Sequence, residues 1–352
     1  MREGATRERG WATGTDSEKR QSERYWRQHS WLGKVETMIK TLTAALAASV
    51  YILFAIPPAD AASAIKHVIV IAMENTDAKE IYGKKDRAPY INDSLIPNYA
   101  RGTNFRNPLP DLDSEPHYIW MEAGTNEFGE TKFTTDEDPS PSNSTATKDH
   151  LVTQIEKSGT VTWMTYQEDI NSKTGQCPIV SSFPYAPKHN PFVFFQDVSG
   201  NPPRKDNEFC KMHTRPYTAF AADLAANKLA NYVFITPNLC HDMHGDKKNR
   251  CPKVDRVRAG DKWLSWELPR IIDWADKNSG VIFIVWDEGA SKKSTIPFLA
   301  IGPGVKAGHA SDVKYDHGSL VRSVEEIFDL PILPTVAGNN SFADMFKAGS
   351  FP

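Results

Sequence analysis

Short apolar runs recur along this 352-residue chain, and they limit the folds that it can adopt. The runs are five to eight residues long and rich in β-branched and aromatic side chains. Apolar runs without polar alternation are typical of strands buried on both faces, as in a parallel sheet. We expect strands at Ile65–Ala72, Val161–Thr165, Tyr232–Thr236, Val281–Trp286 and Pro297–Ile301.

Segments with helical patterns lie between these runs, at Pro116–Ala123, His150–Lys157, Tyr217–Lys228, Lys262–Lys277 and Ser319–Phe328. The alternation of strands and helices predicts an α/β sandwich with a mostly parallel central sheet flanked by helices. Residues 129–147 and 188–211 are rich in polar residues and proline, and we expect both to be surface loops.

Polar residues follow three of the apolar runs: Glu74 and Asn75, then Asp242 and His244, then Asp287 and Glu288. Open parallel sheets bind ligands outside the carboxyl ends of their strands, so these clusters are predicted to meet at one edge. Carboxylate and amide oxygens suit a hard divalent cation. The alternative for any single pair is a helix cap or a solvated turn.

Ser114 stands just before a helical pattern, where free N–H groups and the helix dipole favour a phosphoryl oxygen. Beside a metal its hydroxyl would be an activated nucleophile; read alone, it is an ordinary N-cap. His317, Lys188 and His189 are further candidates for a second metal or for phosphate contacts. Each of these histidines could equally be a structural hydrogen-bonding group.

Seven ordered segments resemble the phosphoesterase family that contains acid phosphatases, phosphatidylinositol-3-phosphatase-like proteins and phospholipase C. They are HVIVIAMENT, SEPHYIWMEAGT, TWMTYQED, KHNPFVFF, ITPNLCHDMH, IVWDEG and YDHGSLVRSVEEIFDL. The resemblance implies a catalytic domain over residues 65–347 with an alkaline-phosphatase-like fold, a three-layer sandwich.

The resemblance also implies residue roles. Ser114 matches the nucleophile. A first metal would be bound by Glu74, Asn75, Asp287 and Glu288, and a second cluster for metal or phosphate would be formed by Asp242, His244 and His317. His189 and Lys188 would lie on the phosphate side. The family's Ser-x-Pro-Asn pattern has His117 in place of asparagine here, which leaves the pH optimum and the substrate preference open.

These features predict a metal-dependent phosphomonoesterase of the acid phosphatase type that acts through a phosphoserine. Its substrate would be a phosphorylated small molecule or a lipid head group. The alternatives are a phospholipase C-like phosphodiesterase and a non-catalytic binding protein on the same fold. A sulfatase is disfavoured because Ser114-Glu115-Pro116-His117-Tyr118 lacks the arginine of that signature.

The N-terminal segment indicates export. Met38-Ile39-Lys40 precedes an uncharged run that ends in Ala59-Asp60-Ala61, the pattern of a signal peptide over residues 38–61. Residues 1–37 would then be an extension outside the native protein. An uncleaved membrane anchor is the alternative; we expect signal cleavage, no stable membrane span afterwards, and a periplasmic or secreted protein.

The four cysteines of this apparently exported chain allow three disulfide pairings. We predict Cys177–Cys210 and Cys240–Cys251, since each pair closes a polar loop. The net charge of −3 and the lack of a basic run argue against a nucleic-acid partner.

Overall fold

A computed structural model of the chain describes residues 65–352, apart from residues 130, 172–174 and 292–293. The extension expected at residues 1–37 and the signal peptide expected at 38–61 lie outside the described residues. Among the described helices, none is long and apolar enough to cross a membrane.

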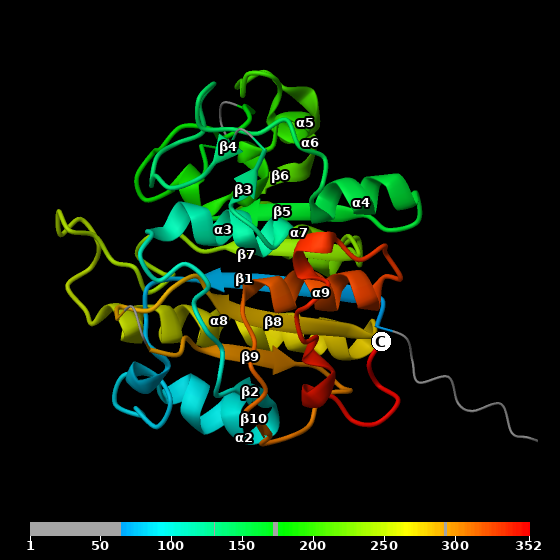
Figure 1. The fold of residues 1–352 in the computed structure, drawn as a ribbon. Helices are drawn as coiled ribbons and strands as arrows, with labels where there is room; N and C mark the ends of the chain where they lie inside the picture. The colour runs from blue at the N-terminus through cyan, green and yellow to red at the C-terminus, as the bar shows by residue number, and fades with distance from the viewer. Residues whose placement is uncertain (1–64, 130, 172–174, 292–293) are drawn as a thin grey trace, which may run out of the picture. The chain divides into compact units, whose positions relative to one another are not determined.

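An eight-stranded sheet forms the centre of the described region (Figure 1). In spatial order its strands are β10 (Ala310–Ser311), β2 (Ala100–Gly102), β9 (Phe298–Ile301), β8 (Gly280–Trp286), β1 (His67–Met73), β7 (Tyr232–Thr236), β5 (Trp163–Gln167) and β6 (Thr214–Pro216). β8, β1, β7, β5 and β6 are parallel to one another, whereas β9 is antiparallel to both of its neighbours. All five predicted strands are present, and the prediction of a mostly parallel sheet is confirmed.

Helices cover both faces of the sheet, which confirms the predicted α/β sandwich (Figure 1). α3 (Ser114–Ala123) and α9 (His317–Ile327) pack together on one face. On the other face α7 (Tyr217–Ala225) contacts α8 (Arg256–Lys277), where the Tyr217 hydroxyl meets the Glu267 carboxylate. The shorter helices are α2 (Ile96–Asn98), α4 (Leu151–Ser158), α5 (Gln196–Ser199) and α6 (Glu208–His213).

The central strands are apolar on both faces because helices cover both. Every residue of β7 and β8 is buried, as is every residue of β1 after His67. The capping residues also agree with the sequence: Gly124 ends α3 in the left-handed conformation, and Asp316 begins α9 with a capping box.

The prediction of surface loops is wrong for much of residues 188–211. Single-turn helices at Pro187–His189 and Pro191–Phe194, followed by α5 and α6, fold this stretch. Phe192, Phe194 and Phe195 are fully buried, so the segment contributes to the core. Residues 129–147 contain β4 (Thr131–Lys132), which pairs with β3 (Glu127–Phe128), and the rest of their described part has no regular element.

Both predicted disulfides are present. Cys177–Cys210 joins the segment after β5 to α6, and Cys240–Cys251 closes the loop after β7.

Candidate active site

The polar clusters that follow β1, β7 and β8 meet at the carboxyl edge of the sheet. The three strands are adjacent and parallel, with β1 in the middle. Backbone hydrogen bonds then join the segments beyond the strand ends: Glu74 N–H donates to the carbonyl of Asp242 (2.8 Å), and Thr76 N–H donates to that of Glu288 (3.1 Å). The predicted convergence is therefore observed.

Asn75 is held in a tight turn between Asp287 and Glu288. Its backbone N–H donates to Asp287 Oδ1 at 3.0 Å, and its side-chain amide donates to Glu288 Oε1 at 2.7 Å. Its φ of +25° lies in a region that asparagine tolerates better than most residues. The turn leaves the Asn75 amide oxygen buried without a hydrogen-bond partner.

Ser114 begins α3 and places its hydroxyl beside the acidic cluster. Its Oγ lies 3.1 Å from Glu74 Oε2 and 3.4 Å from Glu288 Oε1. The serine is almost fully buried, and it lies in the first turn of the helix, where backbone N–H groups lack helical partners. The residues predicted for nucleophile and first metal are thus side by side.

Several oxygens in this cluster are buried without a hydrogen-bond donor: Glu74 Oε1, Asn75 Oδ1, Asp242 Oδ2 and Asp287 Oδ2. Burial, and then the charge of Asp242, raise the pKa of Glu74 well above its ordinary value. Burial and Glu74 do the same to the pKa of Asp287, and burial with Asp287 raises the pKa of Glu288 to about 9. Carboxylates crowded out of water in this way are stabilised by a cation, so the donor set fits a divalent metal.

A second group is formed by Glu74, His189 and Asp242, whose ligand atoms all lie within 4.8 Å of one another. His189 Nε2 is 3.3 Å from Glu74 Oε1, and Nδ1 is 3.7 Å from Asp242 Oδ2. The imidazole stacks on Tyr118 of α3, with ring centroids 5.1 Å apart. Burial, and then the charge of Lys188, hold the pKa of His189 well below its usual value, so the ring is neutral near pH 7.

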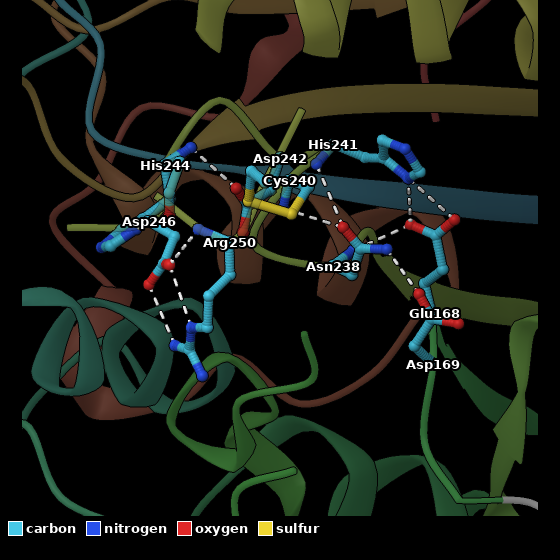
Figure 2. The surroundings of a disulfide bond; sticks show 11 residues. Glu168, Asp169, Asn238, Cys240, His241, Asp242, His244, Asp246 and Arg250 are labelled. Carbon is cyan, nitrogen blue, oxygen red and sulfur yellow. Dashed lines mark hydrogen bonds and ion pairs between the residues drawn. A yellow bond between two sulfur atoms is a disulfide. The ribbon is translucent and has the colours of Figure 1, made fainter. Parts of the chain in front are cut away.

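Asp242 lies in the loop after β7, which hydrogen bonds and a disulfide cross-link (Figure 2). The Asn238 side chain accepts hydrogen bonds from the N–H groups of Cys240 (2.8 Å) and His241 (3.2 Å). The His241 imidazole contacts the Glu168 carboxylate at 3.0 Å, and the Cys240–Cys251 disulfide closes the loop (Figure 2). Asp242 Oδ1 in turn accepts the N–H of His244 at 2.7 Å.

The other predicted histidines lie close to the cluster in different ways. His244 donates from Nδ1 to the Gly245 carbonyl, and its ring lies 5.9 Å from that of His189. His317 donates from Nε2 to the Trp286 carbonyl, which leaves Nδ1 buried without a partner.

His117, Asp287 and Glu288 each have a potential metal-ligand atom, and these three atoms lie within 4.8 Å of one another. The two ring nitrogens of His117 nevertheless contact the Asp113 carbonyl and the Asn107 side chain, each at 2.7 Å. Burial lowers the pKa of His117 to about 4.

Sequence reasoning missed three residues that shape the site. Arg256 of α8 binds both the Met243 carbonyl and the Thr76 hydroxyl, which joins the loops after β7 and β1. Glu115 and Asp136 bring the 135–143 segment onto the start of α3. The sequence predicts this helix only from Lys262 onward, which leaves Arg256 outside it, and no local pattern marks a contact between distant loops.

Comparison with known proteins is consistent with this geometry. Residues 111–331, well over half of the chain, match the Phosphoesterase family. The chain belongs to this family. The family and its phosphatase relatives identify the protein as a hydrolase that acts on phosphoric ester bonds.

Two curated relatives of this family member are phosphatases. The chain is 29% identical over 274 residues to a phosphatidylinositol-3-phosphatase of Mycobacterium tuberculosis, which covers 78% of this chain and 80% of that protein. It is 31% identical over 155 residues to an acid phosphatase of Aspergillus fumigatus, which covers 42% of this chain but only 31% of that longer protein.

Solved structures resemble the chain at the level of the fold. The lipoteichoic acid synthase LtaP of Listeria monocytogenes is 12% identical, with a TM-score of 0.50 over 83% of this chain and 77% of that one. A protein of the alkaline phosphatase superfamily from Vibrio parahaemolyticus is also 12% identical, with a TM-score of 0.49 over 77% and 68%. At this level of identity the similarity concerns the fold alone, and it agrees with the α/β sandwich described above.

Proposed function

We propose that this phosphoesterase is an exported phosphomonoesterase that requires a divalent cation and transfers the phosphoryl group through Ser114. The observation that carries the proposal is the Ser114 hydroxyl at the start of α3, 3.1 Å from Glu74. Around it lie buried carboxylate oxygens without hydrogen-bond donors.

Glu74, Asn75, Asp287 and Glu288 would hold the cation. When bound, it would lower the pKa of a nearby hydroxyl and neutralise charge on the phosphoryl oxygens. Asp242, His244 and His317 remain candidates for a second cation or for contacts to the phosphate, as do His189, Lys188 and His117.

The residues of the chain have separate tasks in this proposal. The Ser114 hydroxyl donates to the Glu74 carboxylate, which is placed to take its proton as the oxygen attacks phosphorus. The new Ser114–phosphorus bond replaces the bond to the leaving alcohol. Water then cleaves the phosphoserine, and the Asp242–His189 pair is placed to accept its proton.

Two features support export. The sequence of residues 38–61 has the order of a signal peptide, and we propose that cleavage follows Ala61. All four cysteines are paired in disulfides, which are rare in reducing compartments. N-terminal sequencing of the exported protein tests this proposal, and a mature start well before Ala59 would exclude the cleavage site.

For the substrate we propose a phosphate monoester of a small molecule or of a lipid head group. Relatives of the chain are named a phosphatidylinositol-3-phosphatase and acid phosphatases, which favours monoesters over diesters. The decisive assay compares a chromogenic phosphate monoester with a bis-ester, on chelated protein to which single divalent cations are returned.

Ser114→Ala is the decisive variant, because it removes the nucleophile and leaves the helix intact. We expect monoester turnover to fall by about a thousandfold or more. Ser265→Ala, at a half-buried position of α8 where the hydroxyl donates to the Lys262 carbonyl of the same helix, is the matched control and should retain the wild-type rate. Turnover by Ser114→Ala close to that of the control would end the proposal.

A further inference from the structure

The 135–143 segment is tied to the residue that follows the proposed nucleophile. Glu115 is fully buried, and its Oε2 accepts hydrogen bonds from the Glu137 N–H (2.7 Å), the Thr135 hydroxyl (3.1 Å) and the Asn143 side chain (3.2 Å). The same segment is also tied to Ser181, because the Asp138 carboxylate accepts hydrogen bonds from the Ser181 N–H and hydroxyl, each at 2.7 Å. The segment therefore has a fixed position over the start of α3.

This position places the Asp136 carboxylate at the site itself. Its Oδ1 accepts the N–H of Glu115 at 3.3 Å, one of the free N–H groups in the first turn of α3. Its Oδ2 forms an ion pair with the Lys188 ammonium. The two side chains are only 28% and 20% exposed, so the pair is partly shielded from water.

The charge of Asp136 acts on groups from several segments around the site. It is among the charges felt by His117, His244 and Glu288, which come from α3, the loop after β7 and the end of β8. Lys188 in turn is in electrostatic contact with Glu74 and Asp287. Asp136 and Lys188 are thus close enough to the acidic cluster for their charges to act on its members.

The partners of Asp136 are the groups that a phosphoryl anion requires. A helix N-terminal N–H and a lysine ammonium are typical phosphate ligands. In the absence of substrate, the Asp136 carboxylate accepts from the Glu115 N–H and pairs with the Lys188 ammonium. An anion that binds to these two groups must displace the carboxylate. Burial lowers the pKa of Lys188, but the charge of Asp136 outweighs this effect and raises it above its ordinary value, so the ammonium stays charged.

We propose that Asp136 is an internal competitor of the phosphoryl group: it occupies Lys188 and the Glu115 N–H until the substrate displaces it. This role rests on the proposed phosphatase function, and it makes Asp136 a determinant of affinity for anions rather than a catalytic residue. Strongly charged monoesters displace the carboxylate, while weakly charged anions do not.

Asp136→Asn tests the inference, because the amide keeps the size of the side chain and loses its charge. We expect the dissociation constant of inorganic phosphate, titrated calorimetrically into the metal-loaded protein, to fall about three- to tenfold. The KM for a chromogenic monoester should fall by a similar factor, with kcat little changed. Glu137→Gln, an exposed charge in the same segment, is the matched control and should change either constant by less than about twofold.

The Lys188→Gln background separates competition from a structural role. There the gain from the Asp136→Asn substitution should be smaller, because the Glu115 N–H is the one remaining group of the two for which the carboxylate competes. Asp136→Ser, which keeps an acceptor for the Glu115 N–H, serves as the second variant if Asp136→Asn melts at a lower temperature than wild type.

Phosphate affinity that is unchanged or weaker in these Asp136 variants would overturn the inference, and so would a gain of undiminished size in the absence of Lys188. The outcome is separable from that of the proposed function. A protein that hydrolyses no ester yet binds phosphate more tightly as Asp136→Asn would refute the phosphatase and not the competition. An active phosphatase whose phosphate affinity is unchanged by Asp136→Asn would refute the competition and leave the proposed phosphatase function standing.

Discussion

The hydroxyl of Ser114 donates to Glu74 Oε2 across 3.1 Å, a contact that joins the start of α3 to the end of β1. The other carboxylate oxygen of Glu74 lies 3.3 Å from His189 and has no hydrogen-bond donor. Glu74 is the one residue shared by the contacts of the nucleophile and by the group with His189 and Asp242. In the absence of a cation, burial and Asp242 disfavour the ionised form of Glu74. With a cation bound, the proposed mechanism requires that ionised form.

Glu74→Gln should therefore separate activity from stability. We expect kcat/KM for a monoester to fall at least about a hundredfold, because the acceptor for the serine proton and a metal ligand are lost. In chelated protein the same substitution should raise Tm by about 2–4 °C, since it removes a carboxyl whose ionisation is disfavoured by burial and then by the charge of Asp242. Glu80→Gln, which removes a surface charge paired with Arg87, is the control. A chelated Glu74→Gln protein that melts below chelated wild type would contradict this account.

Gly260 permits the loop that carries Asp242 to pack directly on α8. A Cβ at this position would lie 2.4 Å from Met243 Cγ and 2.9 Å from the His241 carbonyl oxygen. Helix propensity alone predicts that Gly260→Ala stabilises by about 1 kcal/mol. The contact predicts the opposite sign, a loss of about 1–3 kcal/mol from overpacking, together with reduced turnover because Asp242 is displaced. Urea unfolding decides the sign, and a stabilised variant would show that the loop moves away at little cost.

The two disulfides should differ in their effect on catalysis. Removal of either pair as a double serine variant is expected to cost about 2–4 kcal/mol of stability. Loss of Cys240–Cys251 should in addition lower kcat/KM several-fold, because this bridge closes the loop that positions Asp242 (Figure 2). Loss of Cys177–Cys210, which joins other segments, is the matched control. Equal losses of activity, after correction for the unfolded fraction, would contradict the distinction.

The sequence predicts the central strands well because their environment is uniform. β1, β7 and β8 are apolar on both faces, and a buried strand requires this composition. β2, β6 and β10 were missed because they span only two or three residues and include charged or polar side chains. The pairing of such short strands depends on backbone partners that come from distant segments of the chain.

The start of α8 shows a different limit. Only Val257, Gly260 and Asp261 are buried in its first six residues, so the apolar period begins at Trp263. The burial of Gly260 reflects close packing, which a hydropathy pattern does not record. Within the site, the order of strands was sufficient to bring Glu74, Asp242 and Asp287 together. The position of Asp136 was not predictable, since it depends on Glu115 and Ser181 in two other segments.

The carboxyl of Glu325 on α9 predicts a pH dependence of stability that is independent of the site. It is fully buried and accepts the Leu333 N–H at 2.9 Å, and burial raises its pKa to about 7. Because an unfolded glutamate titrates near pH ~4.3, the folded state binds more protons between these values. The contribution of Glu325 to stability is thus present at low pH and is lost as the pH rises through about 7. Glu325→Gln does not titrate, so its Tm relative to wild type should rise by about 3 °C between pH 5 and pH 8. Glu326→Gln, which removes the next charge along the helix and its pairing with Arg322, is the control. Melting profiles of Glu325→Gln and wild type that run parallel across this range would show that the carboxyl is ionised at both ends.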